Sequence, residues 1–575
     1  MRVIVTAGHV DHGKSTLVRR LTGMEPDRWA EERRRGLTID LGFAWTRIGE
    51  EDVAFVDVPG HERFVPNMLA GAGPAPAVLF VVAADEGWMP QSAEHLAALD
   101  AFGVRRGLLV VTKADRADPA AATALARREI AATSLGDVPS VAVSGTTGAG
   151  LDRLRTAIGD LTAGLPSPDP DADVRLWIDR AFTVSGAGTV VTGTLAAGTI
   201  AAGDELLLGS ARVKVRALQA LGEPRDRVGA VARVAVNLRG TARGDVGRSD
   251  VLLTPGRWRT TAEFDVRLRG AAAADLHREL VLHLGTAAVP VRVRPLGTDT
   301  ARLTTAIPLP LRTGDRGLVR DPGEHRIAAG FDVLDVDPPA LSRRGAARAR
   351  GRELAEADLA RVYLHRKGFV READFAAMGL RPVGERLGEW CADEDRLTEL
   401  RAQAASVVKA WDSTAAGVPV EALRRRLGLP AAELVVPVVR GTGLEVAGGL
   451  VRRPGAELAP AVEKALEVVA KRLAEHPFRA PEADELRALG LGRRELAAAV
   501  RLGRLTAVAD GVVLGADVEE RAVEELRRLP QPFTVSEARK ALDSTRRVMI
   551  PLLERLDAAG LTEPLGDGTR RTTAS

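Results

Sequence analysis

Cysteine is almost absent from this sequence of 575 residues, and so are long apolar runs. The single cysteine, Cys391, excludes a disulfide within the chain and argues against a structural zinc site built from cysteines. No apolar run approaches the roughly 20 residues of a membrane-spanning helix. The start, MRVIVTAGHV, lacks the charged and apolar segments of a signal peptide. We therefore expect a cytoplasmic, monomeric protein without a membrane partner.

An excess of charge of one sign is also lacking. Lys and Arg number 80 against 77 Asp and Glu, and residues 341–575 carry 39 against 35. A bias this small does not indicate nucleic-acid binding by itself. Hydrophobic residues at 45% and charged residues at 27% are ordinary for a globular protein. At roughly 100–200 residues per domain, the length predicts about three to six domains.

The first 165 residues alternate short β-branched runs with helical patterns. Such alternation predicts an α/β domain with a parallel, doubly wound sheet. The expected strands are 2–6, 53–57, 78–83, 107–112 and 139–144. A linker rich in Pro and Asp, PSPDPDAD, follows at residues 166–173.

Residues 174–340 carry short β-rich runs separated by Gly, Asp and Pro turns, which predict antiparallel barrels. The break near residues 255–261 divides them into two barrel domains, 174–254 and 258–340.

The remaining chain is helical and contains a weak repeat of 62 residues, in which Leu427-Gly428-Leu429 recurs as Leu489-Gly490-Leu491. Each unit combines two helices, a turn and a β-hairpin, as winged-helix domains do. A plain helical bundle is the alternative, but it does not explain the hairpins. The predicted winged-helix units are 345–400, 401–455, 458–516 and 517–575.

A phosphate-binding loop lies between the first predicted strand and a helix. Residues 8–15, GHVDHGKS, match G-x-x-x-x-G-K-[ST] in the context that this motif requires. Backbone N–H groups and the helix N-terminus favour phosphate here. Lys14 is expected to reach the β and γ phosphates and Ser15 to bind Mg²⁺. The predicted phosphate contacts are Gly8, His9, Val10, Asp11, His12, Gly13, Lys14, Ser15 and Thr16.

Two later segments supply the parts that sense and hydrolyse a γ-phosphate. Thr38 can complete the Mg²⁺ coordination, and Asp57 can hold the ion through water. Gly60 can donate its N–H to the γ-phosphate, and His61 follows beside the expected attacking water. The predicted catalytic residues are therefore His61, Lys14 and Gly60, with Val10 and Leu37 as an apolar gate beside His61.

The base is predicted to be guanine. Asp115, in the segment Thr112-Lys113-Ala114-Asp115, can accept from both N1–H and the exocyclic amine of guanine, a donor pair that adenine lacks. The Lys113 stem can lie over the base. The segment Ser144-Gly145-Thr146 fits the last base-contacting loop. The predicted fold is thus a multidomain chain with an α/β P-loop GTPase domain, two β-barrels and tandem C-terminal winged-helix (α+β) domains, with GTP or GDP and Mg²⁺ as cofactors.

These motifs resemble those of translational GTPases. GHVDHGKST, RGLTID and DVPGH, together with two barrels, resemble elongation factor Tu. The whole chain resembles the bacterial selenocysteine-specific elongation factors, most clearly in residues 177–183 (WIDRAFT), residues 186–194 (GAGTVVTGT) and the winged-helix tail. The resemblance implies GTP-dependent delivery of selenocysteinyl-tRNA to the ribosome at UGA codons. It also implies that the winged helices bind a selenocysteine-insertion mRNA hairpin.

The same resemblance places an aminoacyl pocket at Asp179, Arg180 and Arg233. A selenol is largely ionised at neutral pH, and guanidinium groups would stabilise that charge, whereas serine carries none. The alternative is an ordinary ion pair at a barrel edge. One residue departs from the general GTPase pattern, because Thr112 stands where Asn is usual. Threonine cannot offer an amide's donor and acceptor, so its contact with the base should differ.

The last winged unit carries four cations that are expected to gather at one corner and to bind RNA: Arg539, Lys540, Arg546 and Arg547. Ser544 or Asp543 is expected to cap the helix that carries the last two. A solvated face is the alternative for this cluster. Two other functions remain open at this point: a GTP-switched regulatory or assembly protein whose tail binds a protein, and a factor that delivers another aminoacyl-tRNA.

Overall fold

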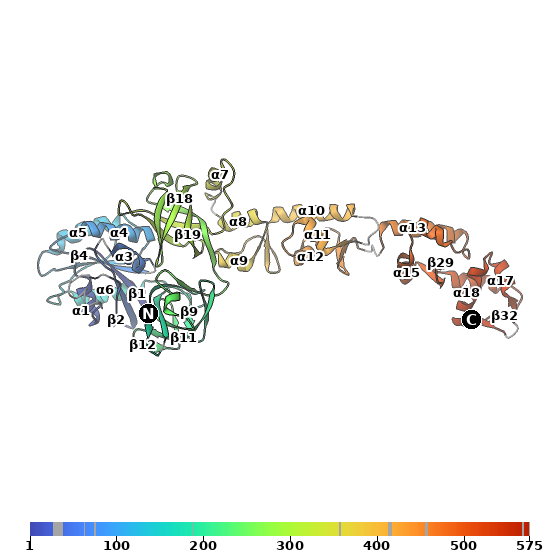
Figure 1. Ribbon diagram of the computed structural model, residues 1–575, viewed down its shortest axis with the longest axis horizontal. Helices are drawn as coiled ribbons and strands as arrows, with labels where there is room; N and C mark the ends of the chain where they lie inside the picture. Colours follow the sequence, from blue (N-terminus) through green and yellow to red (C-terminus); the bar gives the residue numbers. More distant parts are fainter. Residues whose placement is uncertain are drawn as a thin grey trace. The chain divides into compact units, whose positions relative to one another are not determined.

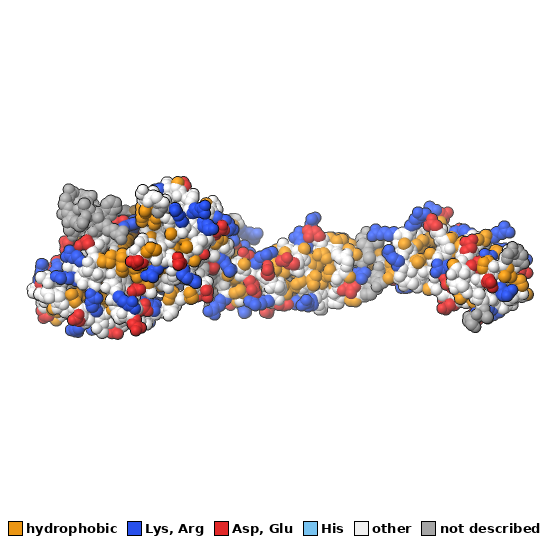
Figure 2. Space-filling view, turned by 90° about the horizontal axis from the view of Figure 1, so that it is seen from below, with side chains coloured by type: hydrophobic (Ala, Val, Ile, Leu, Met, Phe, Trp, Pro, Cys, Tyr) orange, Lys and Arg blue, Asp and Glu red, His pale blue; other side chains and the backbone are white. Residues whose placement is uncertain are grey.

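The computed structural model describes all residues except 27–37, 39, 62–63, 74–75, 187, 356–357, 412–416, 455–457, 566–567 and 574–575. The chain forms two compact units (Figure 1): Met1–Gly384 with Glu389–Cys391, and Glu385–Gly388 with Ala392–Ser575. None of the described helices has the length and apolar character to cross a membrane. On the face shown in Figure 2, basic and acidic side chains are interspersed.

The nucleotide-binding domain is built on a six-stranded sheet in the order β2-β3-β1-β4-β5-β6. Five strands are parallel, as the sequence predicts, and β2 runs antiparallel to β3 across a tight turn at Gly49. The strand β2 was not among the expected ones, because its exposed polar positions hide the apolar alternation. The strands are β1 (Arg2–Ala7), β2 (Gly42–Ile48), β3 (Glu51–Asp57), β4 (Ala77–Ala83), β5 (Gly107–Thr112) and β6 (Ser140–Ala142).

Helices cover both faces of this sheet (Figure 1). Because side chains alternate along a strand, Val3 and Val5 enter one buried cluster, and Ile4 enters another on the opposite face. This two-sided burial explains the nearly continuous apolar strands. The helices are α1 (Lys14–Thr22) and α6 (Leu151–Ala163) on one face, and α3 (Val65–Ala72), α4 (Pro90–Phe102) and α5 (Pro119–Ala131) on the other.

Two barrels follow. In the first, β10 pairs with both β15 and β11, which closes the order β10-β15-β7-β8-β14-β11 into a ring. Its strands are β7 (Arg175–Val184), β8 (Gly188–Leu195), β10 (Glu205–Leu208), β11 (Ala211–Ala220), β14 (Ala232–Arg239) and β15 (Val251–Leu253), with β9 (Thr199–Ala201), β12 (Glu223–Arg225) and β13 (Arg227–Gly229) at its edges. The second is a closed barrel of β16 (Arg259–Arg269), β17 (Glu279–Leu284), β18 (Ala287–Pro295), β19 (Thr300–Leu311), β20 (Arg316–Asp321) and β21 (Arg326–Asp335).

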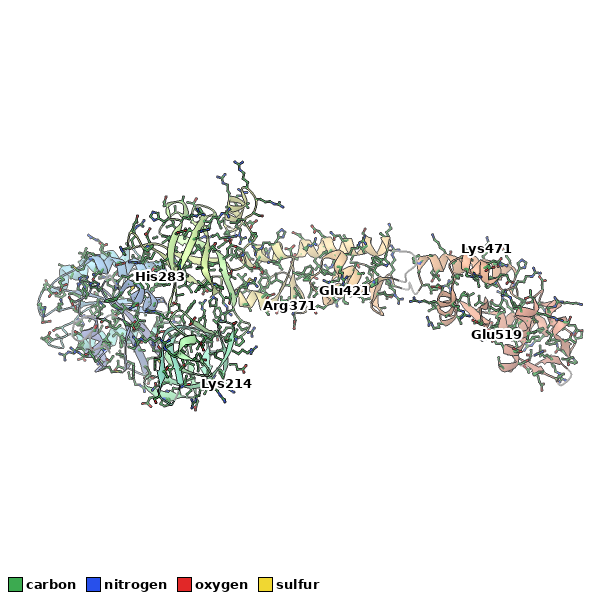
Figure 3. The ribbon with its side chains drawn as sticks, in the orientation of Figure 1. Lys214, His283, Arg371, Glu421, Lys471 and Glu519 are labelled. Carbon is green, nitrogen blue, oxygen red and sulfur yellow. The ribbon has the colours of Figure 1, made fainter. Side chains whose placement is uncertain are left out.

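The segment after the second barrel packs onto it. Tyr363, Phe375 and Met378 share one core with the barrel residues Val266 and Phe331. On β17 of this barrel, burial lowers the pKa of His283 to about 4, so this side chain is neutral at physiological pH (Figure 3). The elements of the segment are α7 (Ala346–Glu353), α8 (Leu359–Lys367), β22 (Phe369–Arg371), α9 (Glu372–Ala377), β23 (Glu385–Leu387) and β24 (Trp390–Ala392).

The second unit is helical with small sheets, as in winged-helix domains. It begins with α10 (Glu394–Ala410), β25 (Val418–Pro419), α11 (Val420–Leu427), α12 (Val435–Val439), β26 (Glu445–Ala447) and β27 (Leu450–Arg452). Next come α13 (Pro460–Glu475), α14 (Ala483–Ala488), α15 (Arg493–Arg501), β28 (Leu505–Ala509) and β29 (Val512–Gly515). The last are α16 (Val518–Leu526), β30 (Phe533–Thr534), α17 (Val535–Ala541), α18 (Arg546–Ala558), β31 (Thr562–Pro564) and β32 (Thr569–Thr572). The fold predicted from the sequence, an α/β P-loop domain, two barrels and C-terminal winged helices, is confirmed.

Candidate functional site

The phosphate-binding loop joins β1 to α1 as predicted. At Gly8 φ is +132°, and a Cβ there would collide with the Val81 carbonyl, so the close approach of the two strands requires glycine. The Lys14 ammonium donates to the carbonyls of Gly8 (3.0 Å) and His9 (2.8 Å), which keeps its charge inside the loop. A phosphate entering the loop therefore meets a lysine that is already in place.

Two side chains of α4 hold this loop through its backbone N–H groups, and neither was predicted from the sequence. Gln91 Oε1 accepts from Val10 N–H at 3.3 Å, and His95 Nδ1 accepts from Gly8 N–H at 3.0 Å. Burial, with the charge of Lys14, lowers the pKa of His95 to about 3, so the ring is neutral and can accept. The only sequence signal was the spacing of four residues, which places both on one face of a helix.

Two of the three residues predicted to hold Mg²⁺ lie side by side. Ser15 Oγ lies 3.0 Å from Thr38 Oγ1, and the fully buried Asp57 accepts from Thr6 Oγ1 at 2.7 Å. Two hydroxyls and a carboxylate are hard oxygen donors that suit this ion.

The γ-phosphate segment lies against the same loop. A Cβ on Gly60 would collide with Lys14 Nζ and with the backbone of Val10, so only glycine fits there. His61 follows, half-buried, with its ring 5.9 Å from that of Phe64. Leu37, the second residue of the expected apolar gate, lies outside the described residues.

The segment predicted to recognise the base shows what a threonine does at this position. Thr112 Oγ1 donates to the His12 carbonyl at 2.7 Å, so it fastens this segment to the phosphate loop. The Lys113 ammonium donates to Glu86 at 2.5 Å, which extends the lysine stem. Asp115 is exposed, and a hydrogen bond from Ser144 lowers the pKa of its carboxyl group. The carboxylate is thus ionised, as an acceptor for guanine has to be.

The last predicted base loop closes the site beside the phosphate loop. Arg20 on α1 donates through Nε to the Gly145 carbonyl (2.6 Å) and through its terminal nitrogen to the Thr146 carbonyl (3.3 Å). A Cβ on Gly145 would meet Thr16 at 3.2 Å. All the predicted nucleotide segments therefore meet at the carboxyl ends of the parallel strands, where open α/β sheets bind ligands.

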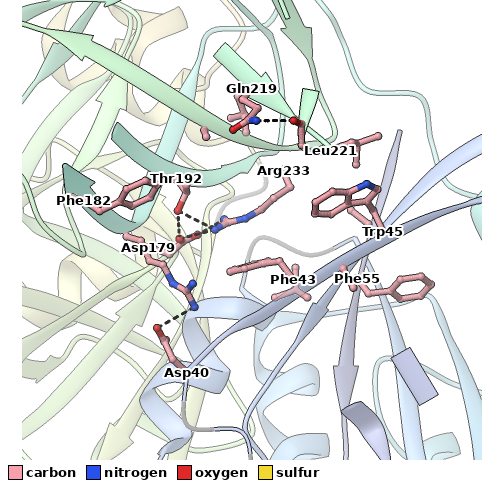
Figure 4. Close-up of a pocket in the computed structure, with 18 of the residues that line it drawn as sticks. Asp40, Phe43, Trp45, Phe55, Asp179, Phe182, Thr192, Gln219, Leu221 and Arg233 are labelled. Atoms are coloured by element: carbon pink, nitrogen blue, oxygen red, sulfur yellow. Dashed lines mark hydrogen bonds and ion pairs between the residues drawn. The ribbon is translucent and has the colours of Figure 1, made fainter. Parts of the chain in front are cut away.

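A pocket of about 840 Å³ lies between the nucleotide-binding domain and the first barrel (Figure 4). Phe43, Trp45 and Phe55 of β2 and β3 form an aromatic side. The barrel side carries the three residues implied by the resemblance: Asp179, Arg180 and Arg233.

A β-bulge brings Asp179 and Arg180 to this one pocket. Consecutive strand residues normally point to opposite faces. The pairing of β7 with β8 shifts register between Ile178 and Arg180, so Asp179 is the extra residue. Both side chains line the pocket as a result.

Arg233 is held by a small polar network. It forms a two-pronged ion pair with Asp179, one prong at 2.7 Å, and it donates to Thr192 Oγ1 at 3.1 Å. Thr192 Oγ1 donates to Asp179 at 2.8 Å. The guanidinium also lies 3.7 Å from the centre of the Phe43 ring. The guanidinium group of Arg233 is thus fixed in position at the wall of the pocket.

Arg180 connects the pocket to the nucleotide-binding domain. It pairs with Asp40 at 3.0 Å and donates to the Leu41 carbonyl. Arg248 lies 3.9 Å from the same Asp40 and donates to Asn67 at 2.6 Å. Four arginines and two aspartates line the pocket, so its wall is cationic: Arg180, Arg233, Arg243, Arg248, Asp40 and Asp179.

The structure places the four predicted RNA-binding residues around the turn between α17 and α18. Arg539 and Lys540 end α17, and Arg546 and Arg547 begin α18. A carboxylate from the preceding winged unit lies beside one of them. Arg547 pairs with Glu482 at 3.1 Å, and Asp543 pairs with Arg479 at 2.7 Å.

The expected helix cap was wrong. The residue before α18 is Thr545, without a side-chain cap, and the buried Ser544 donates to the Phe478 carbonyl at 2.6 Å. Ser544 faces the neighbouring winged unit because the last two units pack against each other.

Comparisons with known proteins match three parts of the chain by family model and its whole length by one solved structure. Three family models match: the elongation factor Tu GTP binding domain at residues 1–163, the beta-barrel domain of selenocysteine-specific elongation factor at 261–340, and the winged helix of elongation factor SelB at 524–571. A crystal structure of bacterial selenocysteine-specific elongation factor EF-Sec is 25% identical, with a TM-score of 0.74 over 100% of both chains.

Two curated relatives show the extent of the sequence similarity. The chain is 37% identical over 390 residues to the selenocysteine-specific elongation factor of Escherichia coli K12, covering 65% of this chain and 62% of that protein. It is 33% identical over 293 residues to elongation factor Tu 2 of Streptomyces avermitilis, covering 46% of this chain and 75% of that protein. The chain therefore spans less than two thirds of the length of the Escherichia coli relative.

Proposed function

Because the chain belongs to the elongation factor Tu family of translational GTPases and matches the domains of its selenocysteine-specific members, we propose that it uses GTP to deliver selenocysteinyl-tRNA to the ribosome at UGA codons. In this proposal the winged-helix tail binds an mRNA hairpin, and GTP is hydrolysed on the ribosome.

The nucleotide site supports the GTPase part of the proposal. Lys14 would contact the β and γ phosphates, Gly60 would donate its N–H to the γ-phosphate, and His61 would orient the attacking water. Ser15, Thr38 and Asp57, the last through water, would hold Mg²⁺, which neutralises phosphate charge when bound. Asp115 would select guanine.

One observation carries the choice of aminoacyl group: the network of Asp179, Thr192 and Arg233 in a pocket with an excess of arginine. A selenolate entering this pocket would meet guanidinium groups held in fixed positions. The hydroxyl of serine, which is neutral, would gain little from them. The same geometry therefore favours selenocysteine over its precursor serine and over most other aminoacyl groups.

The test compares selenocysteinyl-tRNA with seryl-tRNA on the GTP form. We expect the wild type to prefer selenocysteinyl-tRNA and Arg233→Met to lose about 10-fold to 100-fold of that preference, because a hydrogen bond to a charged group contributes about 1.5–3 kcal/mol. Thr192→Val is the matched control, since it removes a neutral partner and should lose less. Equal affinity of the wild type for both tRNAs would contradict the proposal.

A further inference from the structure

A buried network of ion pairs holds the helix α7 against the second barrel. Arg350 is 2% exposed, and its Nε donates to the fully buried Asp265 at 2.8 Å. It also pairs with Asp335, and it donates to Glu353 at 2.9 Å. From the barrel side, Arg302 Nε donates to the same Asp265 at 2.7 Å. These contacts fix which face of α7 points toward the barrel.

Backbone packing holds the same face. A Cβ on Gly351 would collide with the Leu296 carbonyl, so the helix approaches the barrel as closely as only glycine permits. Leu354 is fully buried against Leu296 and Leu334, and Arg267 donates to the Leu354 carbonyl at 2.9 Å. The helix is therefore a rigid platform rather than a loose surface element.

The outer side of this platform carries a stripe of arginines, namely Arg344, Arg348 and Arg352, spaced four residues apart. Arg348 and Arg352 lie on one face of α7, and Arg344 lies just before the helix. All three are exposed, and their side chains make no hydrogen bond or ion pair with any described residue. Glu353, the acidic residue at the end of α7, is engaged by Arg350. Side chains of α7 project away from the barrel (Figure 3).

Several exposed arginines on other helices of this chain have carboxylate partners. Arg127 pairs with Asp137 at 2.6 Å, Arg425 with Glu421 at 3.1 Å, and Arg521 with Asp517 at 2.7 Å. Like charges four residues apart destabilise a helix, so an unpaired stripe has a cost that an anionic partner would remove. Arg348 and Arg352 are about 6 Å apart along the helix axis. A nucleic-acid backbone offers such a regular row of anions, and guanidinium groups can bind phosphates in a two-pronged way.

We propose that the stripe Arg344, Arg348 and Arg352 binds the sugar–phosphate backbone of the tRNA whose aminoacyl end occupies the pocket of Figure 4. The proposal rests on the proposed function, because it takes this tRNA as the ligand. The pocket, the two barrels and α7 belong to one compact unit. The distance and direction from the pocket to α7 are therefore the same for every tRNA whose end is held in the pocket. Phosphate contacts strengthen binding of the tRNA body without reading its amino acid.

The test measures the affinity of the full-length GTP form for selenocysteinyl-tRNA at several salt concentrations. The variant combines Arg344→Gln, Arg348→Gln and Arg352→Gln. We expect the variant to bind the tRNA about 10-fold or more weakly at low salt. The slope of log affinity against log salt concentration should be shallower by about one for each phosphate that loses its arginine. The control combines Arg127→Gln, Arg128→Gln and Arg153→Gln, which change the net charge equally and should leave the slope unchanged.

The outcomes separate this proposal from the one on which it rests. The stripe variant should keep the preference for selenocysteinyl-tRNA over seryl-tRNA, because its affinity for both tRNAs should fall by the same factor. If the wild type shows no such preference, the proposed function fails. If the preference stands but the stripe variant binds tRNA with an unchanged salt slope, the stripe proposal is overturned. An effect confined to the binding of ribosomes, or of an acidic protein, would also overturn it. The thermal unfolding temperature should not fall, because these side chains form no hydrogen bond or ion pair with the described part of the fold.

Discussion

At the scale of single residues, the side chains of the nucleotide site have two kinds of role. Some are placed to face the ligand, and others hold neighbouring residues in position. Thr112 donates to the phosphate loop and Ser144 to the carboxylate of Asp115. Gln91 and His95 accept from backbone N–H groups of the loop. Asp115 alone, among these five, is an exposed carboxylate at the expected place of the base. We therefore propose that this carboxylate selects guanine.

The first prediction follows from that assignment. Asp115→Ala should lower GTP affinity by orders of magnitude and leave the weak ATP affinity nearly unchanged, because only guanine offers the paired donors that the carboxylate accepts. Nucleotide titrations of the variant and the wild type measure both affinities. Arg116→Gln, a neighbouring change of charge outside the base contact, is the control. Equal affinity of the wild type for ATP and GTP would show that the site does not select guanine.

At the scale of elements, the loop before β2 connects the nucleotide site to the pocket. Thr38 lies 3.0 Å from Ser15 at the proposed Mg²⁺ site, and two residues later Asp40 pairs with Arg180 of β7. A movement of this loop with the nucleotide would therefore change the counter-ion of a pocket arginine. We therefore predict that this loop couples the two sites, with Asp40 as the contact on the pocket side.

The prediction at this scale concerns Asp40→Asn. Removing the ion pair should bring the affinities of the GTP and GDP forms for selenocysteinyl-tRNA closer together, by about twofold to tenfold, as expected for a partly exposed pair that couples two sites. Asn67→Ala, which removes the contact with Arg248 instead, serves as the comparison. If the ratio of the two affinities stays at its wild-type value, Asp40 does not couple the sites.

At the scale of the whole molecule, the last two winged units form one body. Val469, Leu486 and Leu514 of one unit share a hydrophobic core with Leu526 and Leu552 of the other. The ion pairs of Arg547 with Glu482 and of Arg479 with Asp543 cross the same boundary. A fragment that begins at residue 517 would cut through this core, so the smallest tail fragment to test is 458–575.

That fragment should bind a cognate mRNA hairpin without the GTPase region. Arg546→Ala should weaken binding and lower the salt slope by about one, because one phosphate would no longer be neutralised. Arg547→Ala should cost less than Arg546→Ala, because Glu482 partly neutralises Arg547. Arg528→Ala, just after α16, is the control. Equal, weak binding of the hairpin and of a scrambled RNA would favour a tail that binds a protein partner.

The sequence by itself determined the fold class, and it predicted the segments of the nucleotide site. Strand and helix periodicities depend on neighbouring residues, and the phosphate-loop motif is a contiguous segment, so both can be recognised without a structure. The winged helices were visible for the same reason, through a repeat of local elements. Asp179, Arg180 and Arg233 came from the resemblance, because nothing in the local pattern shows that β7 and β14 meet β2.

Only the tertiary structure decided which partners these residues have. The bulge that turns Asp179 and Arg180 to one pocket is a property of the pairing between β7 and β8. The hydrogen bonds of Gln91 and His95, and the carboxylate beside Arg547, come from segments distant in sequence. The platform under α7 depends likewise on Asp265 of a strand far upstream. The sequence gives the charge and the shape of each side chain. Packing between elements decides which groups neutralise or orient that side chain, because those groups come from distant segments. These contacts determine what the residue can bind.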